Sequence, residues 1–276
     1  MSMRPNTLRD YAFPTIGAIS VRDVSQSDVL RVLAPIWTEK AETARRVRQR
    51  IRTVIDWART AGHFEGVNPV DGIEKGLAKQ KDRVTHHAAM AWTQVPAFLP
   101  KIGESVAALA LRFLVLTGAR TGEVIGARWA EIDWDAKLWI IPADRMKAGR
   151  EHKVPLTDEA LALLEQVRGL SSKFPFPGSK RDCGLSNMAM TQVLRRLGRT
   201  DVTVHGFRSS FRDWAEEKGN MPREVAELCL AHDVGNEVER AYRRSDLLEK
   251  RRSLMERWAR FCFPTSAKVL VLGRSR

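Results

Sequence analysis

Four short segments of the sequence contain reactive side chains that could act together in one reaction. They contribute two arginines, a lysine, two histidines and a tyrosine, namely Arg120, Lys147, His205, Arg208, His232 and Tyr242. A guanidinium can place two N–H groups on phosphate oxygens, and a phenolic oxygen becomes a nucleophile where cations stabilise the phenolate. The cysteines and histidines have no spacing typical of a metal site. The set therefore predicts metal-independent attack on a phosphodiester.

The two arginines occupy different local settings. Arg120 lies in Thr-Gly-Ala-Arg-Thr-Gly-Glu, where the glycines permit a tight turn and Glu123 is near enough to hold the guanidinium. His205 and Arg208 stand one helical turn apart and could serve two oxygens of one phosphate. Each motif also has an ordinary explanation, a helix-connecting loop with a surface ion pair or a capping histidine beside a solvated arginine.

The lysine lies in a basic turn between two expected strands. Such a turn could deliver an ammonium into a cleft, where partial burial lowers its pKa toward that of a general acid. Arg150 and Lys153 are alternatives to Lys147 for this role, and basic turns are often solvent-exposed turns with no chemical role. Tyr242 has a charged setting, so it could equally be a surface tyrosine, and His232 could be a helix-terminal residue favoured by the dipole.

Taken in order, these residues resemble the tyrosine recombinase (phage integrase) family. The resemblance is strongest to integrases carried by genomic islands and satellite phages. It is carried by Arg120, Lys147, His205-x-x-Arg208, His232 and Tyr242. The match is close over these residues, and a looser likeness extends back to about Leu8 and on to Phe261. The combination is far more specific than any one motif.

The resemblance implies a role for each residue. Tyr242 would attack the scissile phosphate, form a 3′-phosphotyrosyl bond and release a 5′-hydroxyl. Arg120 and Arg208 would stabilise the pentavalent phosphate electrostatically. Lys147 would protonate the leaving 5′-oxygen.

Three further residues have implied supporting roles. His205 would be an acid/base or a phosphate ligand, His232 would hydrogen-bond the phosphate, and Glu123 would support the neighbouring arginine. Because the bond energy is kept in the protein–DNA ester, no metal, ATP or other cofactor is expected. The implied partner is double-stranded DNA at attachment sites. A tetramer is expected on synapsed DNA, and a monomer or weak oligomer without it.

Bulk properties agree with a nucleic-acid partner. The formal charge is +13, from 46 Lys+Arg against 33 Asp+Glu. Such an excess attracts a polyanion. The best apolar run is far shorter than the ~20 residues that span a bilayer, and the N-terminus lacks a secretory signal. Three widely spaced cysteines indicate no disulfide framework. We therefore expect a protein of a reducing cytoplasm that does not bind membranes, and the resemblance implies a bacterial protein that acts at the nucleoid.

Hydrophobic periodicity predicts a mainly α protein with a small β-sheet or hairpin (α+β). We expect a helical core-binding domain over residues 1–80, a catalytic domain over 81–265 and a basic tail over 266–276. Strands are predicted at 138–142 and 152–156, and residues 175–182 are expected to form an exposed loop. Helices are predicted over 38–62, 158–169, 188–197, 206–218, 222–230 and 246–261, with two more between 92 and 116.

One helix of the first domain has a basic stripe. Arg45, Arg48, Arg52 and Arg59 recur at helical spacing beside its apolar face. They could contact the DNA backbone and set position and salt dependence, or they could simply be a solvated face.

The chain begins inside what the resemblance makes the core-binding domain. Island-type integrases have a longer N-terminal region with an arm-site DNA-binding domain, so the sequence predicts a truncated integrase. Two other functions stay open. A catalytically idle remnant would only bind DNA, and a type IB topoisomerase-like enzyme would share the chemistry without synapsis.

Overall fold

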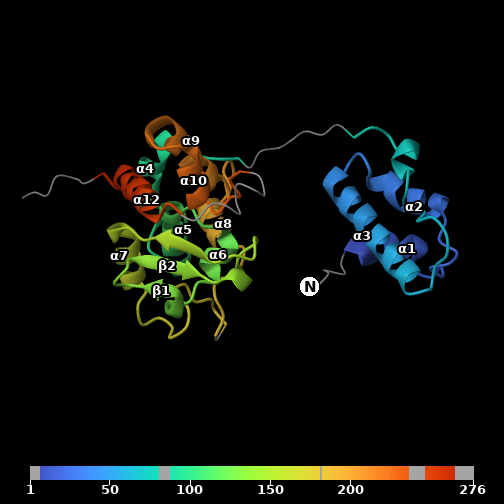
Figure 1. The fold of residues 1–276 in the computed structure, drawn as a ribbon, viewed down its shortest axis with the longest axis horizontal. Coiled ribbons are helices and arrows are strands. Elements are labelled where there is room, and N and C mark those ends of the chain that lie inside the picture. Colours follow the sequence, from blue (N-terminus) through green and yellow to red (C-terminus); the bar gives the residue numbers. More distant parts are fainter. Residues whose placement is uncertain (1–6, 81–87, 181, 236–245, 265–276) are drawn as a thin grey trace, which may run out of the picture. The chain divides into compact units, whose positions relative to one another are not determined.

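A computed structural model describes residues 7–80, 88–180, 182–235 and 246–264, and the chain divides into two compact units, residues 1–85 and 86–276 (Figure 1). Both units are largely helical, and the second contains one small sheet. The predicted mainly α class with a small sheet is therefore confirmed. Each unit has its own cluster of buried apolar side chains. Within the described ranges, no helix is both long and apolar enough to cross a lipid bilayer.

Over its described residues, 7–80, the first unit is built from six helical segments. They are the π-helix η1 (Leu8–Ala12), α1 (Phe13–Ile16), α2 (Gln26–Leu33), the 3₁₀ segment η2 (Ala34–Ile36), α3 (Ala41–Thr60) and the 3₁₀ segment η3 (Ile73–Gly76). Ser25 and Asp28 form a capping box at the start of α2, because each side chain accepts from the other residue's backbone N–H. Hydrogen bonds from the Ser25 hydroxyl, from the Ser25 backbone N–H and from Arg31 lower the pKa of Asp28 to about 2. The helix expected over residues 38–62 is α3.

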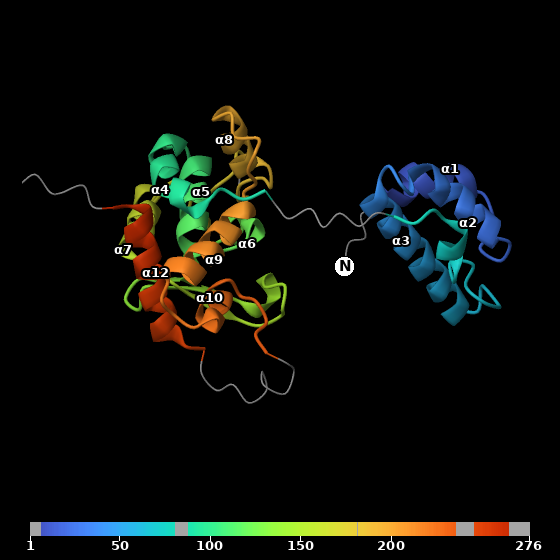
Figure 2. The same ribbon diagram turned by 90° about the horizontal axis from the view of Figure 1, so that it is seen from above.

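The second unit surrounds one helix that is apolar on all sides. Almost every residue of α5 (Val106–Thr117) is buried, which is typical of a central core helix. Figures 1 and 2 show other helices packed around it. They are α6 (Thr121–Ile125), α7 (Asp158–Gln166), α8 (Ala189–Arg196), α9 (Gly206–Lys218) and α12 (Leu248–Cys262). α10 (Arg223–Cys229) packs on α9 and α12. Before α5 come η4 (Trp92–Gln94), α4 (Val95–Phe98) and η5 (Leu99–Ile102).

The sheet has three antiparallel strands in the order β1-β2-β3. β1 (Ile132–Asp133) follows the 3₁₀ segment η6 (Trp129–Glu131) and pairs with β2 (Leu138–Ile141). β2 pairs with β3 (His152–Pro155), and Ile141 lies opposite His152. The connection between β2 and β3 contains the 3₁₀ segment η7 (Ala143–Arg145) and then the turn with Lys147. β2 and β3 occupy the predicted positions, whereas β1 is too short to have been recognised from sequence periodicity.

A buried ion pair fastens this hairpin to the rest of the unit. Arg145 binds both carboxylate oxygens of Glu131, which also accepts a hydrogen bond of 2.9 Å from the indole N–H of Trp139. Arg145 donates a further hydrogen bond of 2.6 Å to the backbone carbonyl of Glu123. The β2–β3 connection is therefore tied, just before the turn with Lys147, to the segment that follows Arg120.

The segment at residues 175–182 differs in part from the prediction. Pro175 and Phe176 are buried, and Phe176 packs against Phe113 of α5 with ring centroids 5.4 Å apart. Only residues further along, such as Ser179 and Lys180, are exposed. The prolines and glycine correctly indicated irregular backbone, but they carried no information about the aromatic contact with α5.

The buried pair gives a stability prediction. In Glu131→Leu, Arg145 is left charged in a site where its side chain is only 14% exposed. We expect the free energy of unfolding to fall by about 3 kcal/mol or more, because removing one partner of a buried pair leaves the other uncompensated. Urea titration followed by tryptophan fluorescence measures this. The control Glu165→Ala breaks an exposed pair with Arg168 and should cost less than about 1 kcal/mol. Equal losses in the two variants would contradict the prediction.

Candidate active site

The end of α10 brings two of the predicted arginines together. The last residue of α10 is Cys229, and the two residues after it have carbonyls with no partner inside the helix. Arg208 Nη2 donates to the carbonyl of Leu230 at 2.6 Å, and Arg120 Nη2 donates to the carbonyl of Ala231 at 3.2 Å. Two guanidinium groups from segments far apart in the sequence are thus fixed by adjacent peptide groups.

Arg120 is also held from its own turn, as predicted from the sequence. Its Nη1 donates to Glu123 Oε1 at 2.8 Å, while its backbone N–H donates to Glu123 Oε2 at 2.7 Å. Glu123 is buried, whereas the Arg120 side chain is 25% exposed. Gly118 ends α5 with φ of 62°, a left-handed conformation that favours glycine. The turn therefore directs the Arg120 side chain out of the core, and the carboxylate of Glu123 lies beneath it.

Arg208 is the buried member of the pair. Only 4% of this residue is exposed, and its Nη1 donates to the carbonyl of Gly118. Burial and the neighbouring charge of Arg120 lower the pKa of Arg208 to about 10. It still carries its charge at neutral pH. Backbone carbonyls offset part of the cost of burying that charge, and an anion bound beside it would offset more.

His232 is fixed between a cation and an anion. Its Nδ1 lies 2.6 Å from Glu227 Oε2, and its Nε2 lies 3.0 Å from Arg208 Nη2. Because a guanidinium only donates, Nε2 accepts, so the neutral ring has its proton on Nδ1 and donates it to Glu227. Burial of Glu227 opposes ionisation, but the hydrogen bond from His232 and the charge of Arg212 lower its pKa overall. The predicted histidine therefore contacts an arginine of the site directly.

The remaining predicted residues are less closely grouped. His205 is exposed immediately before α9, three residues ahead of Arg208. Lys147 is exposed in the turn between β2 and β3, and both of its neighbours, Met146 and Ala148, line a cleft of 410 Å³. His232 lines the same cleft. Tyr242 falls in residues 236–245, which lie outside the described part of the chain.

A third histidine, not singled out from the sequence, also lines this cleft. His152 is the first residue of β3 and is partly buried. Its side chain hydrogen-bonds the carbonyl of Cys229, next to the two carbonyls that bind the arginines. Burial and the charge of Arg251, with smaller effects of Arg120 and Arg208, lower the pKa of His152 to about 3. Its position five residues after Lys147 in a strand was the one sequence signal available.

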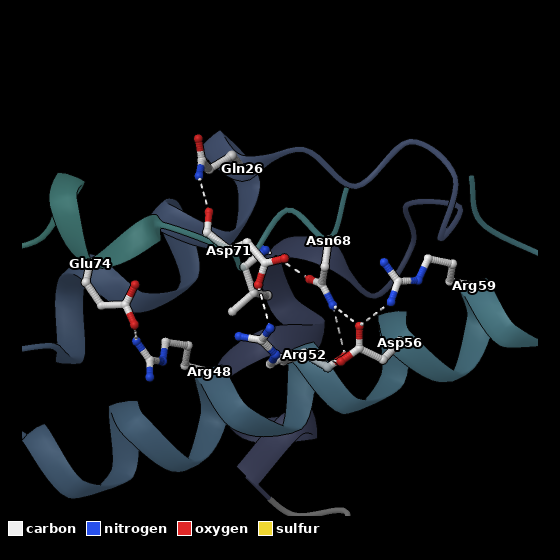
Figure 3. Close-up of polar contacts among 9 residues, drawn as sticks. Gln26, Arg48, Arg52, Asp56, Arg59, Asn68, Asp71 and Glu74 are labelled. Atoms are coloured by element: carbon white, nitrogen blue, oxygen red, sulfur yellow. Dashed lines mark hydrogen bonds and ion pairs between the residues drawn. The ribbon is translucent and has the colours of Figure 1, made fainter. Parts of the chain in front are cut away.

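The predicted basic stripe of the first unit is engaged with carboxylates (Figure 3). Arg48 pairs with Glu74, and Arg52 Nη2 lies 2.7 Å from Asp71 Oδ1. The other pairs are Arg52 with Asp56 at 3.6 Å and Arg59 with Asp56 at 3.8 Å. Arg45 is exposed on the same helix. All of these arginines lie in the first unit.

Comparison with known proteins gives consistent matches. The phage integrase family profile matches residues 93–248, and the phage integrase central domain profile matches residues 3–74. The chain is 37% identical over 256 residues to prophage integrase IntA of Escherichia coli K12, covering 90% of this chain and 61% of that protein. It is 31% identical over 273 residues to the integrase of enterobacteria phage P4, covering 90% and 62%. The chain thus spans less than two thirds of the length of these relatives.

Solved structures share the fold at low sequence identity. A lambda integrase dimer bound to a COC′ core site gives a TM-score of 0.59 at 19% identity, covering 89% of this chain and 90% of that one. The Tn1549 transposon integrase in complex with circular intermediate DNA gives a TM-score of 0.61 at 15% identity, covering 88% of each chain.

Within the described ranges, no group of three or more His, Cys, Asp or Glu side chains could hold a metal ion.

The packing at the end of α10 can be tested through the cysteines. Burial raises the pKa of Cys229 to about 11 and that of Cys262 well above its usual value, whereas Cys183 is exposed. Because the thiolate is the reactive form, an aromatic disulfide reagent at pH 8 should modify one thiol per native chain, at Cys183. All three should react in denaturant. Rapid modification of Cys229 in the native protein would mean that the end of α10, where Arg208 and Arg120 bind, is not buried in solution.

Proposed function

Because the chain belongs to the phage integrase family of tyrosine recombinases, we propose that it is a site-specific DNA recombinase. It would cut and rejoin duplex DNA through a 3′-phosphotyrosyl intermediate during integration or excision of a mobile element. The observation that supports this most strongly is the pair Arg120 and Arg208, fixed on adjacent carbonyls at the end of α10. Two preorganised guanidinium groups are suited to the charge that develops on a phosphodiester in substitution at phosphorus.

In the proposed reaction Tyr242 Oη attacks the scissile phosphorus. The new bond joins Tyr242 to the 3′-phosphate while the bond from phosphorus to the 5′-oxygen breaks. Lys147 supplies the proton that the leaving oxygen takes, and His205 accepts the phenolic proton or binds the phosphate. The strand is rejoined by the reverse steps, with a 5′-hydroxyl attacking the ester. The assignment of Tyr242 rests on the sequence and the family.

The arginines and His232 would bind the oxygens of the phosphate that do not take part in bond exchange. Arg120 is partly exposed and can turn its free N–H groups to an incoming anion, while Glu123 keeps its orientation. His232 accepts from Arg208 in the arrangement described above. To donate to a phosphate, Nε2 would have to carry a proton in place of the hydrogen bond that it accepts from Arg208.

The proposed partner is duplex DNA at attachment sites, and the proposed assembly on it is a tetramer. Lambda integrase has been captured as a tetramer bound to a Holliday junction, and that chain shares this fold with a TM-score of 0.59 at 19% identity. The formal charge of +13 favours association with DNA. We place the reaction in the bacterial cytoplasm, at the nucleoid.

The proposed nucleophile is tested with a nicked suicide duplex built from DNA flanking the gene. Wild-type protein should form an SDS-resistant protein–DNA adduct. Tyr242→Phe should form none, because the attacking oxygen is absent, while its affinity in a gel shift stays within about twofold. Adduct retained by Tyr242→Phe would exclude this tyrosine as the nucleophile.

The same assay separates the other functions. A gel shift without adduct from wild-type protein would indicate a catalytically idle DNA-binding protein. An adduct that leads to relaxation of any supercoiled plasmid, without a requirement for two specific sites, would indicate a topoisomerase-like activity.

The arginines on one side of α3 are proposed to contact the DNA backbone by exchanging carboxylates for phosphates. Each phosphate contact adds roughly 0.9 to the slope of log affinity against log salt. Arg52→Gln should therefore reduce that slope by about 1 in fluorescence anisotropy titrations. The control Arg46→Gln removes a charge that pairs with Glu42 and points away from this stripe, so it should leave the slope nearly unchanged. Equal slopes for both variants and wild type would refute the contact.

A further inference from the structure

We propose that His152 is a positioning residue for DNA cleavage, which holds the β2–β3 hairpin and its Lys147 against the arginine-binding end of α10. The inference rests on the proposed function. It assigns to a histidine outside the family motif the task of placing the general acid relative to the phosphate.

The location of His152 in the sheet connects it directly to the hairpin turn. It is the first residue of β3, opposite Ile141, the last residue of β2. This is the last residue pair of the β2–β3 ladder, and the residues between Ile141 and His152 form the connection that contains Lys147. A displacement at His152 is therefore passed to the lysine over only five residues.

The partner of His152 lies in the arginine-binding segment. Its side chain hydrogen-bonds the carbonyl of Cys229, while the next two carbonyls, of Leu230 and Ala231, accept from Arg208 and Arg120. Three consecutive peptide groups therefore bind three side chains from three different elements. Two of these are the proposed phosphate-binding groups, and the third comes from the hairpin.

A second contact holds the same strand at the neighbouring residue. Arg251 of α12 is 2% exposed, and it donates to the carbonyl of Lys153. Its Nη1 also lies 3.6 Å from Asp246 Oδ2. The start of β3 is thus fixed from two sides, to α10 through a side chain and to α12 through its backbone. Because Arg251 anchors Lys153, loss of the His152 contact should displace the hairpin turn without unfolding the strand.

The charge state of His152 suits this position. Three guanidinium groups, those of Arg251, Arg120 and Arg208, act on it, and the carboxylate of Asp246 lies beyond Arg251. A permanently charged donor here would repel the proposed phosphate-binding groups, whereas a neutral imidazole can donate one N–H to the carbonyl without adding charge. The low pKa keeps the ring neutral at any pH at which DNA is cleaved.

The test compares two suicide duplexes in single-turnover cleavage, one with the natural 5′-oxygen at the scissile bond and one with sulfur in its place. A thiolate leaves without a proton, so the sulfur duplex needs no general acid. Lys147→Ala should lose at least ~100-fold on the oxygen duplex and little on the sulfur duplex. His152→Leu, which keeps an apolar body but has no donor, should lose about 10-fold on oxygen and regain most of it on sulfur. His152→Gln, whose amide can donate, should recover much of the oxygen rate.

The double variant Lys147→Ala/His152→Leu should react with the oxygen duplex no more slowly than Lys147→Ala, because His152 acts through the lysine. Equal losses of His152→Leu on both duplexes, or a rate equal to wild type on oxygen, would overturn the proposal. So would losses that multiply in the double variant. Thermal melting of each variant identifies loss of rate caused by unfolding. Failure of the proposed function itself looks different, because wild-type protein would then form adduct with neither duplex.

Discussion

The three consecutive carbonyls at the end of α10 are the constraint on which the rest of the site depends. The last peptide groups of a helix have no partner within it, and at most helix ends water or a cap satisfies them. Here the carbonyls of Cys229, Leu230 and Ala231 accept from His152, Arg208 and Arg120. The helix ends abruptly with Ala231 at a positive φ of 49°, which turns the chain away immediately before His232. A helix terminus has thereby become the common anchor of groups from α9, α6 and the sheet.

This anchor explains how two guanidinium groups stay close together before any anion arrives. Like charges near each other in a partly buried site raise the free energy of the folded state, and the lowered pKa of Arg208 reflects that. The protein offsets the repulsion with carboxylates placed behind the arginines, Glu123 under Arg120 and Glu227 beyond His232. The histidine adds no charge in its Nδ1–H form. Binding of a phosphate would then relieve the repulsion between the two guanidinium groups. Folding of the domain has already supplied the free energy that brings them together, so the site is preorganised for the anion.

The sequence predicted what depends on local pattern and missed what depends on contacts between distant segments. The helix α9 and strands β2 and β3 follow from spacing within a few residues, and the structure has them where expected. The Arg120–Glu123 pair was predicted for the same reason. His152 and Arg251 gave no such signal, because their partners lie 77 and 98 residues away in the chain. The burial of Phe176 and the carboxylate partners of the α3 arginines were equally invisible, since helical spacing places a charge on a face without saying what lies opposite.

The separation of the site into a fixed part and an exposed part follows from the chemistry proposed for it. In substitution at phosphorus the attacking and leaving oxygens lie on opposite sides, and the other oxygens lie between them. The side chains that bind these other oxygens can be rigid, as Arg208 is. The proposed acid has to reach one side and the proposed nucleophile the other, and in the sequence Lys147 follows β2 whereas Tyr242 follows α10. If the β2–β3 connection moved independently of Arg120 and Arg208, the placement of Lys147 would be left to chance, at a cost in rate that grows with each misplaced ångström. The contacts of His152 with α10 and of Arg251 with β3 remove part of that freedom.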